Sequence, residues 1–337
     1  MLKKESTVTT QWDTAVSVES VTKIFTQWQR ENAGKGLIKN LLKPQKKIIS
    51  ALDDVSFSIN RGEFVAYAGP NGAGKSTTMK LLSGMLQPTE GNISVLGMSP
   101  NKDRVKIMSK LGVLFGNSTE LWWDHPVSQS FEWKKVVWNI PNDVYNRNLE
   151  MVIELLDIGE LMKTFARELS LGQRMRADLA MMLLHSPTLI LLDEPTLGLD
   201  VVAKRQMIDF LKKINQENGV TIICTSHDMD DLEEMAQRIL MISNGKVAYD
   251  GSFDGLRDIT GNLTRFTVTM GGSSPLVLDG GKLIGSDNNI YEYEVDVSVT
   301  PIRTLLRQLS ETDGVKDVEI NKAPIEQVIA GLYAEWK

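Results

Sequence analysis

The segment with the clearest chemistry is a glycine-rich stretch that ends in a lysine and two hydroxyl residues. It reads Gly69-Pro70-Asn71-Gly72-Ala73-Gly74-Lys75-Ser76-Thr77 and fits the pattern G-x-x-x-x-G-K-S/T. In this pattern the glycines let backbone N–H groups converge on phosphate oxygens, and the following helix directs its positive end at the same anion. Lys75 supplies a point charge for the β- and γ-phosphates, and Ser76 a hydroxyl ligand for Mg²⁺. The stretch predicts a nucleotide-phosphate site between a strand at Phe64–Ala68 and a helix at Thr78–Leu86.

A pair of acids forms a second candidate site. Asp193 and Glu194 follow the apolar run Leu189–Leu192, which suits a buried parallel strand. Ligands bind at the carboxyl ends of such strands. Asp193 can hold Mg²⁺ through water, and Glu194 can orient and polarise an attacking water as a general base. For the two acids alone, the alternative is a helix cap or a solvated turn.

A third motif, Leu169-Ser170-Leu171-Gly172-Gln173-Arg174, begins a stretch with helical apolar spacing that runs to Leu184. Taken alone, it is the start of an ordinary helix with Ser170 as the N-cap residue. Taken with the two sites above, it resembles the signature L-S-G-G-Q of the ATP-binding cassette (ABC) ATPases. The resemblance covers about residues 17–250, and two further segments stand in the family's order, Gly198-Leu199-Asp200 and Thr225-Ser226-His227-Asp228.

The resemblance implies a dimer that holds two ATP–Mg²⁺ between facing subunits. The loop Gly69–Thr77 of one subunit would hold the nucleotide, and the signature of the other would contact the γ-phosphate through Ser170, Gly172 and Gln173. Asp200 matches the D-loop that crosses the dimer interface. His227 matches the switch histidine that contacts the γ-phosphate, although outside this context it would be a surface turn residue.

Two positions depart from the family pattern. Leu171 stands where the common signature has glycine, but Ser170 and Gly172 are kept, so we expect the function to survive. Asn117 stands at the Q-loop position, where the family has a glutamine that touches Mg²⁺ and the attacking water. Asparagine offers the same amide oxygen on a shorter side chain, so either the loop lies closer or the metal contact passes through water. The resemblance thus implies a catalytic set of Lys75, Glu194 and His227 and a metal set of Ser76, Asn117 and Asp193.

Aromatic residues are candidates for base and partner contacts. The family stacks adenine on an aromatic side chain upstream of the glycine loop, and Phe25 is our choice, with Trp28 second and core packing the alternative for Phe25. After Asn117, the run Leu121-Trp122-Trp123-Asp124-His125-Pro126 resembles exporter-type ABC ATPases, which work with separately encoded permeases. Tryptophans suit an anchor for a permease helix, and packing inside the helical subdomain is equally compatible with the sequence.

Composition sets the broad class of the protein. The 337 residues suffice for about two domains, and 42% hydrophobic residues exclude wholesale disorder. The formal net charge of -6 argues against nucleic acid as a partner. A single cysteine, Cys224, excludes an intramolecular disulfide and indicates a reducing compartment, and we expect it to be a core thiol. No apolar run approaches the roughly 18 residues of a membrane span, so composition alone favours a soluble cytosolic protein. The resemblance to ABC ATPases implies instead a peripheral protein at the cytoplasmic face of the membrane.

Short apolar runs alternate with longer helical patterns, which predicts an α/β fold. Besides the strands already named, the runs Val55–Ile59 and Val220–Thr225 are expected to be strands. With the resemblance, the expected fold is the P-loop NTPase fold of an ABC cassette, a mixed sheet core with a helical signature subdomain. We expect an N-terminal extension at 1–16, the ATPase domain at 17–250 with a basic insertion at 30–48, and a loop-rich linker at 251–262. A small α+β domain is expected at 263–337.

The small C-terminal domain shows structure but no chemistry. Residues Tyr291–Val299 alternate apolar and polar side chains, as in a half-buried strand. A helix is expected after Pro301, a strand at Val315–Ile320 and a final helix after Pro324. The first helix would present one apolar face made of Ile302, Leu305, Leu306 and Leu309.

The segment Lys35–Lys47 is basic and amphipathic. Its large apolar residues share one helical face and its lysines the other, as in helices that lie on an anionic membrane surface. The alternative is an insertion that packs its apolar face on the ATPase body.

The function favoured is an ATP-binding and hydrolysing subunit that pairs with a second ATPase subunit and drives export through permease subunits. A second hypothesis is an ABC-type mechanical ATPase that acts on the ribosome or DNA, which the single cassette and the absence of a heptad run disfavour. A third is a regulatory nucleotide-binding module with little turnover, for which Asn117 and Leu171 are the only support.

Overall fold

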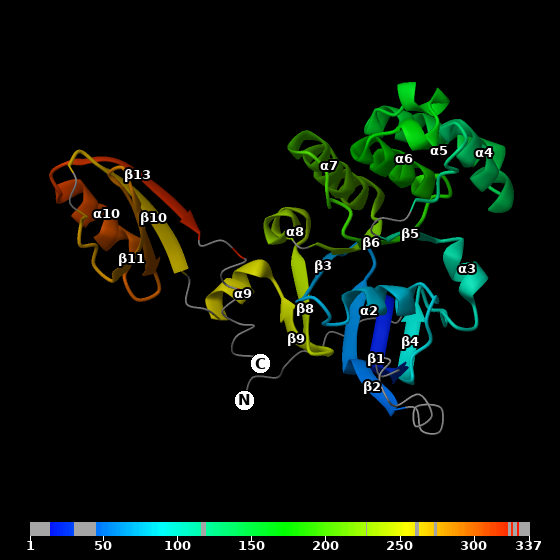
Figure 1. Cartoon of the computed structure of the whole chain (residues 1–337), viewed down its shortest axis with the longest axis horizontal. Helices are drawn as coiled ribbons and strands as arrows, with labels where there is room; N and C mark the ends of the chain where they lie inside the picture. Colours follow the sequence, from blue (N-terminus) through cyan, green and yellow to red (C-terminus); the bar gives the residue numbers. More distant parts are fainter. Residues whose placement is uncertain are drawn as a thin grey trace, which may run out of the picture. The chain divides into compact units, whose positions relative to one another are not determined.

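The computed structural model divides into two units, Met1–Asp250 and Gly251–Lys337 (Figure 1). It describes residues 14–29, 45–115, 119–226, 228–259, 263–272 and 275–322, together with 325 and 329. Two predicted site residues, Asn117 and His227, lie outside the described residues, as do residues 35–44 of the basic segment and the side chain of Trp28.

A six-stranded sheet with the order β5-β6-β7-β3-β8-β9 forms the centre of the first unit. The four neighbouring pairs from β5 to β8 are parallel. Strands β3 and β7 are buried along their whole length, as expected where helices cover both faces of a parallel sheet. The strands are β3 (Phe64–Ala68), β5 (Leu111–Phe115), β6 (Leu189–Asp193), β7 (Thr221–Thr225), β8 (Arg238–Ser243) and β9 (Lys246–Gly251). The sequence prediction of β3, β6 and β7 is confirmed.

A three-stranded antiparallel sheet shares a hydrophobic core with the first sheet. Its strands are β1 (Thr14–Gln29), β2 (Gln45–Asn60) and β4 (Glu90–Val95). The predicted strand Val55–Ile59 is the end of the longer β2. Lys46 and Lys47, expected at the end of a basic helix, are instead paired with β1 in this strand. The β-branched pair Ile48 and Ile49 follows them and favours the extended conformation.

Helices follow the strands of the large sheet. After β3 comes α2 (Lys75–Leu82), before β5 comes α3 (Arg104–Met108), after β6 comes α7 (Val201–Asn218) and after β7 comes α8 (Met229–Met235). A separate helical group beside β5 and β6 contains α4 (Val127–Val137), α5 (Asn142–Leu156) and α6 (Leu171–Leu183), with short 3₁₀ turns at Glu160–Lys163 and Ala166–Glu168 (Figure 1). The helix predicted at Thr78–Leu86 is α2, which begins earlier, at Lys75, and ends earlier, at Leu82. It ends there because Gly84 takes a φ of 70°, which terminates the helix.

The second unit is a four-stranded antiparallel sheet, order β11-β12-β10-β13, with a helix packed on one face. Its elements are α9 (Phe253–Ile259), β10 (Leu263–Met270), β11 (Gly281–Asp287), β12 (Ile290–Asp296), α10 (Ile302–Glu311) and β13 (Val315–Lys322). The segment expected as a loop-rich linker thus contains α9, which buries Phe253 and Leu256 in spite of Gly255.

Two expectations for this unit are corrected. The strand predicted to reach Val299 ends at Asp296, because the Asp296 carboxylate accepts the Ser298 N–H at 2.9 Å and so turns the chain. The helix after Pro301 is confirmed, but only Leu305 and Leu309 of its expected apolar face are buried, whereas Ile302 and Leu306 are exposed. The strand at Val315–Ile320 is confirmed as β13. Of the predicted final helix, Ile325 and Ile329 are described, and both are buried.

Two remaining expectations concern the whole chain. Cys224 is fully buried in β7 and is a core thiol, as predicted. Among the helices of the described residues, none has the length and apolar character needed to cross a bilayer.

Candidate nucleotide site

The glycine loop and the two acids lie where the parallel strands end. Phe115 of β5, Asp193 of β6 and Thr225 of β7 stand side by side in register. Strand β3 lies on the other side of β7 and leads directly into the glycine loop. Because the carboxyl ends of parallel strands meet at one edge of a sheet, the loop, the two acids and the residues after Thr225 share that edge.

The glycine loop has a shape that requires glycine. Gly72 and Gly74 have φ values of 83° and 113°, in the region that side chains disfavour. A Cβ on Gly74 would lie 2.6 Å from the carbonyl oxygen of Ala51, and one on Gly69 would lie 2.3 Å from that of Ile242. The loop therefore presents bare backbone at the start of α2, which is the arrangement that binds phosphate.

Lys75 is the first residue of α2, and its ammonium lies against the loop. Nζ donates to the carbonyl oxygens of Gly69 at 2.6 Å and Pro70 at 3.3 Å, and the residue is buried. Burial lowers the pKa of Lys75, and the carboxylates of Glu194 and Asp193 act in the opposite direction. The ammonium is thus within electrostatic reach of both acids.

Thr225 holds the two acids in place. Its hydroxyl donates to Asp193 Oδ1 at 2.6 Å and accepts the backbone N–H of Glu194 at 3.1 Å. Glu194 has a φ of 59°, which is unusual for a residue with a side chain and indicates a backbone held by its surroundings. One buried hydroxyl therefore fixes both the carboxylate that ends β6 and the backbone of the acid that follows.

The signature motif begins α6 with a capping box. Ser170 Oγ accepts the Gln173 N–H at 3.2 Å, and Gln173 Oε1 accepts the Ser170 N–H at 2.9 Å. The expectation that Ser170 is an N-cap is confirmed. In this arrangement both side chains act as acceptors, so the Ser170 hydroxyl proton and the Gln173 amide protons are still able to donate. The first turn of the helix also leaves backbone N–H groups without helical partners.

The D-loop residue Asp200 caps the next helix, α7, by accepting the Ala203 N–H at 2.9 Å. It shares a hollow of about 520 Å³ with the signature residues Ser170, Gly172 and Gln173. Leu171, the residue that departs from the family signature, lies over Gly198, so that a Cβ on Gly198 would come within 2.8 Å of Leu171 Cδ2. The larger signature side chain is therefore accommodated by a glycine with a φ of 73° in the D-loop segment.

Comparison with known proteins places this geometry in a family. The model of the ABC transporter family matches residues 52–197. The ABC transporter ATP-binding protein NatA of Bacillus subtilis (strain 168) is 30% identical over 212 residues, which are 63% of this chain and 86% of NatA. The chain belongs to the ABC transporter family of ATP-binding proteins. As a member of this family it binds and hydrolyses ATP.

Two further relatives of this ABC ATPase cover the same region. The methionine import ATP-binding protein MetN of Carboxydothermus hydrogenoformans is 30% identical over 221 residues, 64% of this chain and 65% of MetN. A dimeric post-hydrolysis structure of the ATP-binding cassette MJ0796 bound to ADP and Pi superposes with a TM-score of 0.58 and 25% identity. It covers 70% of this chain and 98% of MJ0796. The expected P-loop NTPase fold of an ABC cassette is confirmed.

The aromatic residues of the ABC ATPase differ in their surroundings. Phe25 is half-buried on β1, with the Lys23 ammonium 5.2 Å from its ring centre. Trp122 and Trp123, after the Q-loop position, are 38% and 49% exposed and so are not packed inside the helical group. The Trp122 ring lies 5.4 Å from that of Trp133, and the Arg174 guanidinium lies 4.9 Å from that of Trp123. The three tryptophans Trp122, Trp123 and Trp133 form an exposed aromatic surface.

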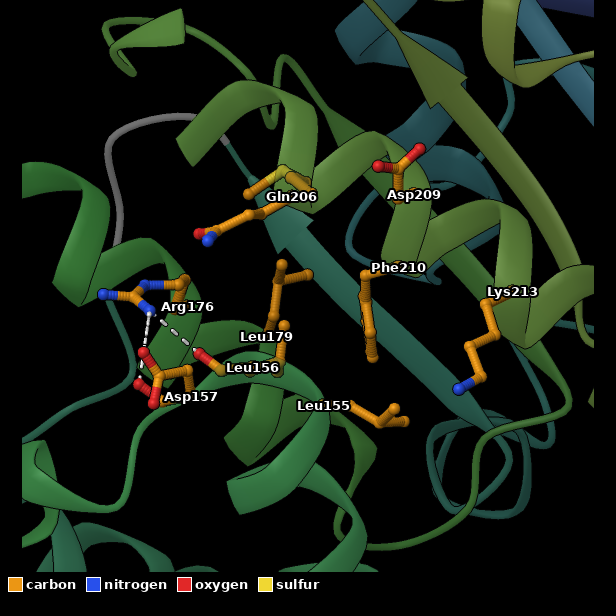
Figure 2. Close-up of a pocket in the computed structure, with 10 residues that line it drawn as sticks. Leu155, Leu156, Asp157, Arg176, Leu179, Gln206, Asp209, Phe210 and Lys213 are labelled. Carbon is orange, nitrogen blue, oxygen red and sulfur yellow. Dashed lines mark hydrogen bonds and ion pairs between the residues drawn. The ribbon is translucent and has the colours of Figure 1, made fainter. Parts of the chain in front are cut away.

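A separate hollow of about 260 Å³ lies between α5, α6 and α7 (Figure 2). Figure 2 shows Leu179 and Phe210 on its floor, and Arg176 bonded at one end to the carbonyl oxygens of Leu156 and Asp157, at 3.1 and 3.2 Å. This hollow shares Arg176 and Gln206 with the hollow of about 520 Å³ that the signature residues line. The hollow thus has a charged rim and an apolar floor. It lies where α6, which begins with the signature motif, is next to α7, which Asp200 caps.

Sequence reasoning missed contacts made by residues distant in the chain. Lys204 of α7 forms ion pairs with Asp228 and Asp231, and Asp178 of α6 accepts hydrogen bonds from Thr119 at 2.9 Å and Glu120 at 3.1 Å. Neither Lys204 nor Asp178 belongs to a motif. The sequence shows only that Lys204 follows Asp200 by one helical turn. This spacing gives no indication that Lys204 pairs with an acid 24 residues away.

Proposed function

We propose that the chain is the ATPase subunit of an ABC transporter that pairs with a second copy around two ATP–Mg²⁺ and drives export through separate permease subunits. The observation that carries the proposal is the meeting of the glycine loop, Lys75 and the acids Asp193 and Glu194 at one edge of the sheet. In this proposal the ATPase domain spans 17–250 after an extension at 1–16, and an accessory domain spans 263–337 after the segment 251–262.

The loop Gly69–Thr77 would hold the phosphates of ATP. Its backbone N–H groups and the start of α2 supply partial positive charge, and Lys75 can exchange its bonds to loop carbonyls for the β- and γ-phosphates. Phe25 is the proposed stacking partner of adenine. These groups fix the γ-phosphate in place and stabilise the negative charge that accumulates as it is transferred.

Ser76 and Asp193 are the proposed protein groups that hold Mg²⁺, with Asn117 as a third ligand. Both described groups offer hard oxygen donors, the type that Mg²⁺ prefers. No group of three or more His, Cys, Asp or Glu side chains among the described residues could hold a metal. This fits an ion that shares its coordination with phosphate oxygens and water. When bound, Mg²⁺ neutralises phosphate charge.

Glu194 is the proposed general base for the attacking water. It follows Asp193 at the strand end, and Thr225 holds its backbone. The carboxylate would orient the water and take its proton as the new P–O bond forms and the bond from the γ-phosphorus to the ADP oxygen breaks. His227 is the proposed contact of the γ-phosphate from the segment after β7.

A second copy would supply the signature. The hollow of about 520 Å³ that Ser170, Gly172 and Gln173 line is also lined by Asp200 of the D-loop and by residues of α7. No residue of the loop 69–77 lines it. The donors that the capping box leaves available can therefore serve a phosphate that another subunit presents. The dimeric state of the relative MJ0796 supports this proposal.

Permease subunits are the proposed membrane partners, which would hold the chain at the cytoplasmic face. The exposed aromatic surface Trp122, Trp123 and Trp133 suits the anchoring of a partner helix, because exposed tryptophans contribute strongly to interfaces. Export is favoured by the resemblance of Leu121–Pro126 to exporter-type cassettes. The relative MetN is named for import, so direction needs its own test.

The variant Glu194→Gln tests the proposed chemistry and assembly together. It should lower the ATPase kcat by about 100-fold or more, because proton abstraction from water is lost, and ATP–Mg²⁺ should convert the chain to a stable dimer in size-exclusion chromatography. Adding Ser170→Arg to this variant should keep it monomeric while it still binds ATP. The exposed acid Glu217 provides the control, and Glu217→Gln should behave as wild type. Full turnover or a monomeric Glu194→Gln chain would contradict the proposal.

Membrane partners are tested with the tagged Glu194→Gln chain and ATP on detergent-solubilised membranes of the native host. Recovery of strongly apolar multi-span chains supports the transporter, and recovery of ribosomal or DNA-bound proteins alone contradicts it. Direction is then measured with the recovered permeases in vesicles. Solute must leave the compartment that holds the ATPase when ATP is added there, and accumulation in that compartment would overturn export.

A further inference from the structure

Lys204 lies between two acids that belong to another helix. Its ammonium forms an ion pair with Asp228 and a second one, at 2.8 Å, with Asp231 Oδ1. Asp231 is buried, and its other oxygen, Oδ2, has no hydrogen-bond partner among the described residues. The ammonium is therefore the main electrostatic support of a buried carboxylate, and it ties α7 to the beginning of α8.

Asp228 makes two hydrogen bonds at the start of α8. Its N–H donates to Ser226 Oγ at 3.0 Å, and its carboxylate accepts the Asp231 N–H at 3.2 Å as the N-cap of α8. Ser226 and Asp228 are the two neighbours of His227 in the sequence. Whatever fixes the Asp228 carboxylate thus fixes one end of the segment that carries the proposed switch histidine.

Lys204 is also attached to the D-loop. Its backbone N–H donates to the Asp200 carbonyl oxygen at 2.9 Å in the first turn of α7, the helix that Asp200 caps. A rigid helical turn therefore separates the D-loop residue from the ammonium that holds Asp228.

The same lysine lines a hollow that contains the proposed general base. This hollow of about 240 Å³ is bounded by Glu194, by D-loop residues from Thr196 to Leu199, and by Lys204, Ser226, Asp228 and Asp231. The walls thus bring together the acid that ends β6, the D-loop and the residues on both sides of position 227.

We infer that Lys204 is a positioning residue, which couples the D-loop to the start of α8 through Asp228 and so holds in place the wall of the hollow that Glu194 also lines. The inference rests on the proposed function, in which Glu194 is the general base. A shift of α7 when a second subunit meets the D-loop would be passed to Asp228 through one ion pair. Lys204 would then influence turnover without touching ATP.

The test compares steady-state ATPase kinetics of the full-length chain. Lys204→Met and Asp228→Asn should each lower kcat by roughly tenfold and leave the KM for ATP within about twofold, because misplacement of a catalytic group affects the chemical step. Asparagine remains a good N-cap, so Asp228→Asn keeps α8 capped while weakening the ion pair. The double variant should be no slower than Lys204→Met, and Lys204→Arg should restore most of the activity.

A neighbouring ion pair supplies the matched control. Arg205 also joins α7 to α8, through Glu234 at 2.6 Å, and its other ion-pair partner among the described residues is Asp209. Arg205→Met should keep kcat within about twofold of wild type. Equal losses in Lys204→Met and Arg205→Met, or unchanged kcat in the folded Asp228→Asn variant, would overturn the inference. The variant Glu194→Gln separates the two levels, since its full activity would refute the proposed function itself, whereas full activity of His227→Ala would remove only the proposed contact of His227 with the γ-phosphate.

Discussion

The Thr225 hydroxyl lies 2.6 Å from Asp193 Oδ1 and also accepts the backbone N–H of Glu194, so one buried group of β7 orients the two acids at the end of β6. The two strands are parallel neighbours, and Thr225 pairs with Asp193 in register. The positions of the Asp193 carboxylate and of the Glu194 backbone therefore depend on the neighbouring strand β7 as well as on β6 itself.

Replacing Thr225 with valine keeps the shape and removes the hydroxyl. We expect kcat for ATP hydrolysis to fall roughly 10- to 100-fold and the Mg²⁺ concentration for half-maximal activity to rise, because residues that orient a ligand carboxylate have effects of this size. Kinetics at varied Mg²⁺ measure both quantities.

The control for this substitution is Thr221→Val, at the other end of the same strand. The Thr221 hydroxyl is also buried and accepts the Gly62 N–H at 2.9 Å. Its loss should reduce stability without a selective change in kcat or Mg²⁺ dependence. If Thr221→Val changed kcat and the Mg²⁺ dependence as much as Thr225→Val does, the role assigned to Thr225 would be wrong.

The contact between Leu171 and Gly198 gives a prediction about stability. Gly198→Ala places a side chain at a φ of 73° and against Leu171 Cδ2, whereas Gly97→Ala at a φ of 76° has nothing within 4 Å. We expect Gly97→Ala to lower the free energy of unfolding by about 1 kcal/mol. Gly198→Ala should lower it by a further 0.5–1 kcal/mol, roughly. Denaturant unfolding measures both, and the excess must disappear when Leu171→Gly is also present. An excess that persists in that background would exclude the contact as its cause.

Asp178 predicts a pH dependence of stability. Burial raises its pKa to about 6, in spite of hydrogen bonds from Thr119 and Glu120. Since the folded state holds this proton more tightly than the unfolded state, the contribution of Asp178 is fully present below pH 4, approximately, and is lost as the pH rises through 6. Asp178→Asn should therefore raise the free energy of unfolding by about 3 kcal/mol at pH 7.5, and by less than about 1 kcal/mol at pH 4.

The comparison of variant and wild type at each pH isolates Asp178. His185 has a pKa lowered to about 4, first by burial and then by Lys134, and it titrates over a similar range with the opposite sign. Because His185 is the same in both proteins, its effect cancels in the difference. A difference that does not change between pH 4 and pH 7.5 would contradict the buried-carboxyl explanation.

The exposed aromatic surface leads to a prediction about partners. Trp122→Ala with Trp123→Ala should reduce recovery of permease chains from membranes by about tenfold or more, because buried tryptophan anchors carry much of the energy of an interface. The control is Val137→Ala, which shortens another exposed apolar side chain of the helical group. Unchanged recovery with both tryptophans replaced would place the permease contact elsewhere.

The parts of the fold and site that the sequence predicted are those with local causes. The loop Gly69–Thr77 and the acids after Leu189–Leu192 each combine strand, turn and chemistry within a few residues. The end of β12 was missed because the alternation of side chains continues to Val299, while the Asp296 carboxylate turns the chain. Lys204 and Asp178 were missed because their partners come from other elements. Only the packing of α7 against α8, and of α6 against the segment between β5 and α4, brings the partners together.

At the other end of the large sheet, Arg238 begins β8 and joins three segments. Its guanidinium donates twice to Asp250, at 2.7 and 2.8 Å, and once to Glu63, at 2.8 Å, just before β3. Charge-assisted bonds of this fork geometry are among the stronger polar contacts in proteins. In mechanical terms, a tension applied to the chain at residue 251 would be resisted at Arg238, at the opposite end of β3 from the glycine loop. A force that reaches the first unit through its last strand would therefore act first on the end of β3 that lies away from the phosphate-binding edge.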